Sequence, residues 1–176
     1  MTQVVAGFDT ERLQAASWKH ALQYRARRRK LTEELASVLT PAVLQYLPAP
    51  LQLEGGPRAV DDWIDARNAE SDVLTIRECG PSALIGLLIL APFEEPDATR
   101  TVHLGYLLAE QAWGRGYATE LLQGLVEALG GQGRPATLLA GVEPGNAASA
   151  RVLQKAGFHL DADLSIPGSD MFRLDL

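Results

Sequence analysis

The sequence contains a single cysteine, Cys79, among its 176 residues. One cysteine excludes an intramolecular disulfide and any metal site built from several cysteines. Long apolar runs are also missing, since the longest, residues 83–93, has the length of a strand and cannot cross a bilayer. The first residues lack the basic start and apolar stretch of a signal peptide. These absences favour a cytoplasmic protein with no metal ion and no membrane partner.

The composition is that of an ordinary globular chain, with 47% hydrophobic and 22% charged residues. Its length fits one domain spanning residues 1–176. The net charge of −6 disfavours general nucleic-acid binding. Residues 12–30 nevertheless hold seven basic side chains and no acidic one. The densest part, Arg25 to Lys30, could contact RNA or an acidic partner, but we favour the simpler interpretation of a solvated helix face or loop.

The hydrophobic pattern predicts an α+β fold with one parallel βαβ connection in its middle. Three strands joined by short connections, including a loop at 94–100, should pair antiparallel, and an alternating half should follow them. The expected strands are 72–79, 83–93, 101–109, 137–142, 158–164 and 170–176, after a strand or irregular segment at 10–24. The expected helices are 32–48, beginning at Thr32 and interrupted by Pro41, then 58–70, 117–129 and one from Asn146 to Gly157.

The most informative segment is 111–120, where two glycines separate a predicted strand from a predicted helix. The first N–H groups of a helix have no intrahelical partner and lie at the positive end of its dipole, so such a turn binds phosphate. Glycine tolerates positive φ and lets the backbone approach the anion closely. The predicted phosphate cradle consists of Gly114 and Gly116, the N–H groups of Arg115, Tyr117 and Ala118, and added charge from the Arg115 side chain.

Three classes of phosphate-binding loop can be compared with this turn. A P-loop needs a Gly-Lys pair, which the sequence does not contain. A dinucleotide-binding loop needs a third glycine, and Thr119 stands in its place. The third class is the loop that binds acyl-CoA.

Residues 101–160 resemble the GNAT superfamily of N-acetyltransferases. Gln111, Gly114 and Gly116 match its Q/R-x-x-G-x-G/A signature. The surrounding sequence is similar to the Rim-type (RimJ/RimL-like) branch, which acetylates protein N-termini. Residues 142–158 are similar to that branch's second signature, in which an Asn-x-x-Ser helix start precedes Val-Leu, Lys and Gly-Phe. The resemblance extends over 31–176, whereas residues 10–30 depart from the alternating first strand of the branch.

The resemblance implies a GNAT acyl-CoA fold, a mixed and mostly antiparallel sheet flanked by helices. It also implies an acyltransferase that moves an acetyl group from acetyl-CoA to a primary amine by direct attack. The amine would belong to a protein N-terminus or a small molecule. The resemblance also adds donor-site residues to the glycine cradle. Leu107, Leu108 and Ala109 at the end of the strand would pair with pantetheine. Gln111 and Asn146 complete the implied donor site. For Asn146 the role of helix cap is also sufficient.

Two side chains are the candidate catalytic residues. In Rim-like enzymes the serine matching Ser149 can protonate the departing thiolate, and an ordinary residue in the first turn of a helix is the alternative. Related enzymes often carry glutamate at the position of His103, and a histidine that titrates near neutrality could replace it as general base. A half-exposed strand histidine is the alternative. Further acidic candidates are Glu120, Asp161 and Asp163.

A second function remains open beside the enzyme. The absence of glutamate at the position of His103 keeps a non-catalytic acyl-CoA-binding or regulatory module in view. Such a module would keep the glycine turn and Asn146 but lack a working base. The sequence does not fix the oligomeric state and leaves a homodimer open.

Overall fold

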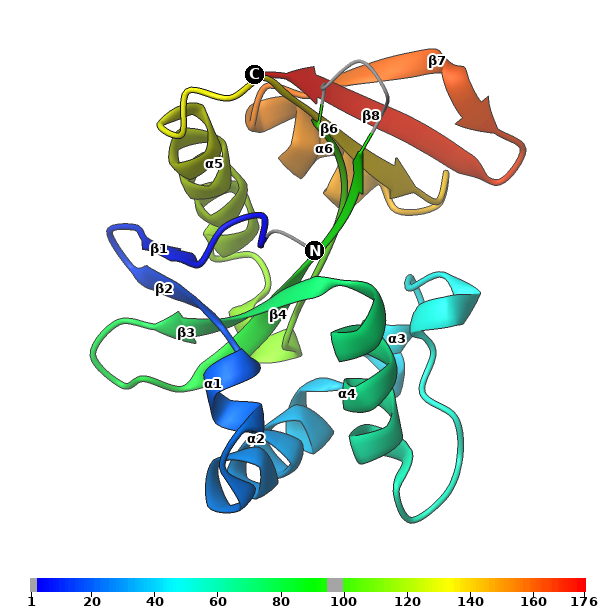
Figure 1. The fold of residues 1–176 in the computed structure, drawn as a ribbon. Coiled ribbons are helices and arrows are strands. Elements are labelled where there is room, and N and C mark those ends of the chain that lie inside the picture. Colours follow the sequence, from blue (N-terminus) through cyan, green and yellow to red (C-terminus); the bar gives the residue numbers. More distant parts are fainter. Residues whose placement is uncertain (1–2, 95–99) are drawn as a thin grey trace.

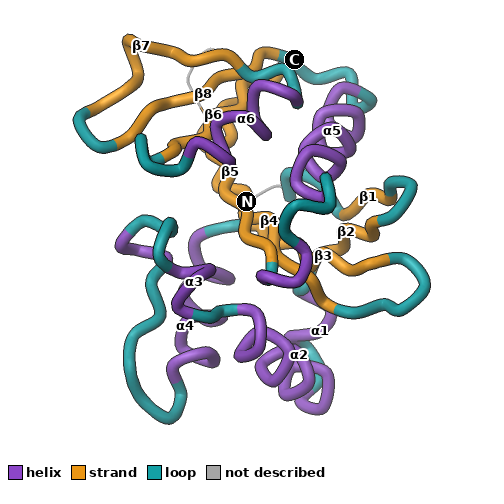
Figure 2. Tube along the Cα trace, turned by 180° about the vertical axis from the view of Figure 1, so that it is seen from behind, coloured by secondary structure: helices purple, strands orange, loops and turns teal. Residues whose placement is uncertain are grey.

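Eight strands form one mixed sheet in the computed structural model, which describes residues 3–94 and 100–176. Helices cover both faces of this sheet (Figures 1 and 2). In chain order the elements are β1 (Gly7–Asp9), β2 (Leu13–Ser17), α1 (Lys19–Leu22), α2 (Arg25–Val38), α3 (Pro41–Leu44), the 3-10 turn η1 (Ala49–Leu51), α4 (Ala59–Glu70), β3 (Asp72–Glu78), β4 (Leu84–Glu94), β5 (Arg100–Leu108), η2 (Glu110–Ala112), α5 (Tyr117–Gly130), β6 (Ala136–Val142), α6 (Ala147–Lys155), β7 (His159–Ile166) and β8 (Ser169–Asp175).

The strand order is β1-β2-β3-β4-β5-β6-β8-β7, and the pair β5–β6 is parallel while the other neighbours are antiparallel. The parallel pairing joins Arg100–His103 to Ala136–Leu139 and then stops. Beyond it β5 stays with β4 as far as Leu108, while β6 follows β8. We call this divergence, between 104–108 of β5 and 140–142 of β6, the splay.

The sheet has an apolar core on each face. On one face, side chains of α5 and α6, such as Leu121, Leu125 and Leu153, pack against the strands. On the other, side chains of α2 and α4, such as Leu35 and Ile64, form a second core. The chain of β5 contributes to both, because successive side chains of a strand point to opposite faces. The α+β prediction with one parallel βαβ connection is therefore confirmed.

The first half of the chain contains the main error in the predicted elements. The long helix begins at Arg25, not at Thr32, and ends at Val38. Arginine, lysine and alanine are good helix formers, so the basic segment extends the helix by two turns. Pro41 does not interrupt a helix but opens α3, where a missing N–H costs nothing, and the Thr40 hydroxyl accepts a hydrogen bond from Val43 N–H.

The other predicted elements are present with boundaries shifted by a few residues. The segment 10–24 contains β2 and the single turn α1. The N-cap Asn146 and the helix from Tyr117 were predicted correctly. The loop expected at 94–100 lies mostly outside the described residues, since 95–99 are not among them.

The close approach of β4 and β5 next to the splay yields a stability prediction. A Cβ atom added to Gly86 would lie 2.2 Å from the Leu107 carbonyl oxygen. Gly86→Ala should therefore lower the free energy of unfolding by about 2 kcal/mol or more, measured by urea denaturation. Gly105→Ala is the matched control, because a Cβ there meets nothing within 4 Å. Equal stability of the two variants would contradict the argument.

Candidate functional site

The glycine turn has the geometry of an anion cradle. Gly114 and Gly116 have φ values of 71° and 79°, a region that favours glycine. Gly116 is the N-cap of α5, and its carbonyl accepts the first intrahelical bond, from Glu120 N–H at 3.1 Å. The N–H groups of Tyr117, Ala118 and Thr119 thus lack intrahelical partners. A Cβ at Gly114 would meet nothing within 4 Å, so the turn is open to a ligand on that side.

Side chains around the turn hold it against the sheet. Arg115 donates to the Glu78 carboxylate at 2.8 Å, and the Tyr117 hydroxyl donates to the same oxygen. These hydrogen bonds, the one from Tyr117 first, lower the pKa of Glu78 below its ordinary value. The Arg115 guanidinium is therefore engaged at the end of β3, while its backbone stays in the cradle. Gln111 is exposed.

The end of β5 presents backbone groups to the splay. Ala109 N–H donates to Ile85 on β4 at 2.8 Å, and the Ala109 carbonyl accepts from Ala112 N–H at 2.8 Å. Both backbone groups of Ala109 are thus engaged within the chain. Because an antiparallel strand alternates its backbone direction, Leu107 also faces β4, whereas Tyr106 and Leu108 face the splay. The Leu108 carbonyl accepts from the Trp113 indole N–H at 2.7 Å.

Across the splay, two hydrogen bonds link Tyr106, Ser149 and Asn146, one to the Ser149 hydroxyl and one from its backbone N–H. The Tyr106 hydroxyl donates to Ser149 Oγ at 3.1 Å. Ser149 N–H donates to the Asn146 side-chain oxygen at 3.1 Å, which is the N-cap bond of α6. Burial raises the pKa of Tyr106, so its hydroxyl stays protonated at neutral pH. Tyr106 was not among the site residues predicted from the sequence.

His103 lies on the other face of β5. It shares that face with Leu107, which belongs to the core of α2 and α4, whereas Tyr106 packs towards α5 and α6. The imidazole is half-buried and lies edge-on to the Phe93 ring, with 5.1 Å between ring centroids. Burial lowers the pKa of His103 below its ordinary value, so the ring is neutral at pH 7. The two catalytic candidates therefore flank the splay from opposite faces.

Two of the remaining acidic candidates, Asp161 and Glu120, have structural partners for their carboxylates. Asp161 accepts hydrogen bonds from the N–H groups of Asp163 and Leu164, both at 3.1 Å, and so shapes a turn within β7. Glu120 forms an ion pair with Arg12, with 2.6 Å between Oε2 and Nη2. A surface hollow beside this pair is lined by Glu11, Arg12, Gly116, Thr119, Glu120, Gln123 and Lys155.

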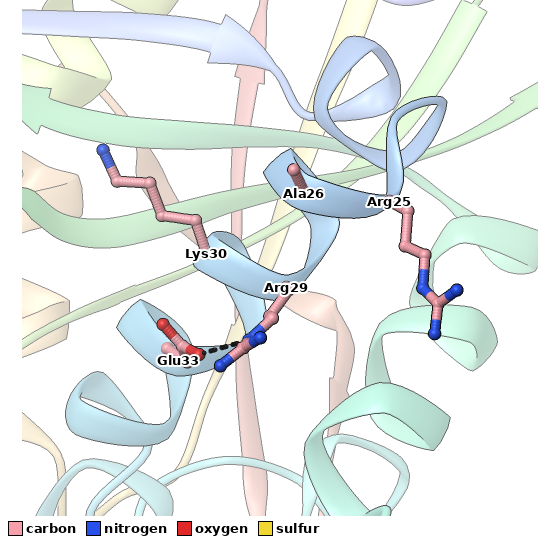
Figure 3. Close-up of a pocket in the computed structure, with 5 residues that line it drawn as sticks. All are labelled: Arg25, Ala26, Arg29, Lys30 and Glu33. Carbon is pink, nitrogen blue, oxygen red and sulfur yellow. Dashed lines mark hydrogen bonds and ion pairs between the residues drawn. The ribbon is translucent and has the colours of Figure 1, made fainter.

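The basic segment Arg25 to Lys30 forms the first turns of α2, on the face of the sheet opposite α5. Arg28 pairs with Asp65 at 2.9 Å and Arg29 with Glu33 at 2.9 Å. Figure 3 shows the shallow pocket there, lined by Arg25, Ala26, Arg29, Lys30 and Glu33. The solvated helix face expected from the sequence is what the structure contains, and this surface is separate from the glycine turn.

Comparison with known proteins places this arrangement in a family. Residues 22–159 match the family model described as an acetyltransferase (GNAT) domain. The chain belongs to the GNAT acetyltransferase family. No curated protein sequence matches the chain.

Solved structures share the GNAT fold over nearly the whole chain. An acetyltransferase from Agrobacterium tumefaciens is 25% identical, with a TM-score of 0.66, covering 99% of this chain and 96% of its own. A proposed ribosomal-protein-serine acetyltransferase from Vibrio cholerae is 17% identical, with a TM-score of 0.71 and coverage of 98% and 99%. RimL, a ribosomal α-N-protein acetyltransferase in complex with coenzyme A, is 16% identical, with a TM-score of 0.67 and coverage of 96% and 97%.

Two features are absent from the part of this GNAT domain that the structure describes. None of its helices is long and apolar enough to cross a membrane. Within the same residues, no group of histidine, cysteine, aspartate and glutamate side chains could hold a metal ion.

The capping bond of Asn146 can be tested by stability. Asn146→Ala removes the oxygen that accepts from Ser149 N–H, so it should cost about 1 kcal/mol. For a chain of this size the melting temperature should fall by about 2–4 °C in a calorimetric scan. Asn146→Ser keeps a capping oxygen and should melt close to the unaltered protein. A cap that contributes little would leave both variants alike.

Proposed function

We propose that this GNAT domain is an acetyl-CoA-dependent N-acetyltransferase acting on a primary amine. The observation that carries the proposal is the position of the glycine turn relative to Tyr106, Ser149 and His103. The open glycine cradle leads into the splay, which ends between the Tyr106–Ser149 pair on one face and neutral His103 on the other. A donor held by its phosphates at α5 would thereby present its thioester between a proton donor and a base.

The donor side divides into three parts. The pyrophosphate would lie on the N–H groups of Arg115, Tyr117 and Ala118 between Gly114 and Gly116. The pantetheine arm would pair with the backbone that faces the splay, so Tyr106 and the Leu108 N–H are better placed for it than Leu107 or Ala109, while the Leu108 carbonyl already accepts from Trp113. The hollow beside α5, with Lys155 on its rim, would take the nucleotide end. Gln111 and Asn146 remain predicted donor contacts at the two ends of this path.

The residues then supply orientation and proton transfer. The amine nitrogen attacks the thioester carbonyl, a C–N bond forms and the C–S bond breaks. Ser149, backed by the protonated Tyr106 hydroxyl, would give the departing sulfur its proton. Neutral His103 would take the proton that leaves the amine nitrogen, directly or through a water molecule. Each proton donor and acceptor can recover its state by exchange with solvent.

The acceptor would approach on the face of the sheet that carries His103. We propose a protein N-terminus as its first class, because the sequence resembles the Rim-type branch and RimL is among the structural neighbours. A small primary amine is the second class. The exposed Phe93 beside His103 would contribute an apolar wall to this approach. The protein would act in the cytoplasm, and a homodimer remains open.

Turnover separates this enzyme from a non-catalytic acyl-CoA-binding module. The protein is incubated with acetyl-CoA and a panel of peptides and small amines. For at least one amine, free thiol should be released faster than by hydrolysis of acetyl-CoA without an amine. His103→Ala should lower kcat by about 100-fold and remove the acidic limb of the kcat/KM profile. That limb should lie below the ordinary pKa of histidine, because burial favours the neutral ring. Coenzyme A binding without turnover for any amine would favour the module.

The cradle itself has a separate test. Gly116→Glu places a side chain at a φ of 79° and a negative charge at the anion site, so coenzyme A binding should be lost in a calorimetric titration. Gly130→Glu, at the other end of the same helix, is the control, because a Cβ there meets nothing within 4 Å. Unchanged binding by the Gly116 variant would show that the phosphates lie elsewhere.

A further inference from the structure

A carboxylate lies in the first turn of α5, next to the phosphate cradle. Glu120 Oε1 accepts from the Thr10 hydroxyl at 2.6 Å and from Arg12 N–H at 2.8 Å. Its Oε2 accepts from Arg12 Nε at 2.7 Å and lies 2.6 Å from Arg12 Nη2. Every one of these donors comes from the turn between β1 and β2.

A negative charge at this place has two opposite effects. It is favourable for the helix, whose N-terminus is positive. It is unfavourable for a phosphate ligand, which needs the same positive end and would be repelled by the carboxylate. Partial burial raises the pKa of Glu120, but the hydrogen bonds from Thr10 and Arg12 together lower it below the ordinary value. The carboxylate is therefore ionised at neutral pH, and its charge needs a counterion if phosphates are to bind beside it.

Arg12 touches the cradle at three further points. Its Nη1 donates to the Arg115 carbonyl at 3.0 Å. Its guanidinium carbon lies 4.6 Å from the centroid of the Tyr117 ring. Its Nη2 lies 3.5 Å from the position that a Cβ of Gly116 would occupy. One side chain thus contacts the residues on both sides of Gly116 as well as Glu120.

We propose that Arg12 is a positioning residue for the acyl donor, which prepares the α5 N-terminus for phosphate by neutralising Glu120 and fixing the Arg115 carbonyl. The role rests on the proposed function, because it presumes that the cradle binds coenzyme A. It differs from a purely mechanical link between the β1–β2 turn and α5. A mechanical link needs both partners, whereas a counterion is needed only while the carboxylate is charged.

Binding of coenzyme A to four variants, measured by calorimetric titration, separates the two roles. Arg12→Ala leaves the carboxylate unpaired and should weaken binding about fivefold. Glu120→Gln keeps a side-chain oxygen for Thr10 and Arg12 N–H and should bind at least as tightly as the unaltered protein. The double variant Arg12→Ala/Glu120→Gln should regain most of the loss. Arg12→Lys keeps the charge and should stay within about twofold.

The control is Arg58→Ala, which removes an arginine from an exposed i,i+4 ion pair with Asp62. This variant should bind coenzyme A as tightly as the unaltered protein. Raising the salt concentration should narrow the difference in coenzyme A affinity between Arg12→Ala and the unaltered protein. Melting temperatures show which variants are folded, and Arg12→Gln, which also removes the positive charge, serves if Arg12→Ala is not folded. A double variant as weak as Arg12→Ala, or an Arg12→Ala that binds normally, would overturn the inference. An unaltered protein that does not bind coenzyme A would instead overturn the proposed function and the inference with it.

Discussion

The end of the parallel pairing between β5 and β6 is the constraint on which the rest of the site depends. Four residue pairs join the strands, and β4 and β8 then draw them apart. A divergent pair leaves backbone groups without a strand partner on its inner edges, which are costly unless something pairs with them. The fold therefore creates, in the middle of its own sheet, an edge to which an extended ligand can add. The N-terminus of α5, which begins at Tyr117, supplies positive charge at one end of that edge.

The glycine turn and the cap of α6 could be predicted from the sequence because each depends on residues that are close together in the chain. Two glycines before an apolar helix predict an anion cradle, and Asn146 three residues before Ser149 predicts a cap; both follow from short-range rules. The start of α2 was misplaced because a basic segment can be a good helix former without showing an apolar stripe. Tyr106 could not be assigned, since its partner Ser149 is 43 residues away and only the tertiary fold joins them.

Charge is arranged differently on the two sides of the sheet. Around the glycine turn, arginines from distant segments lie beside carboxylates, as Arg12 does with Glu120 and Arg115 with Glu78. These pairs balance the local charge. The positive end of the α5 dipole then makes the main electrostatic contribution to attracting an anion. On α2 the cations are exposed and only partly paired. Net charge alone would not have distinguished these two surfaces.

Trp113 gives the molecule an internal optical reporter. Of the tryptophans, Trp18 and Trp63 are 1% and 5% exposed and lie in the core on the far side of the sheet, while Trp113 is 46% exposed. Its indole N–H is bonded to the carbonyl of Leu108, at the mouth of the splay. Indole emission depends on the polarity around the ring and on its hydrogen bonds. Occupancy of the splay should thus change one emitter against a constant background from the other two, and the natural fluorescence of the chain would follow a ligand without any added label.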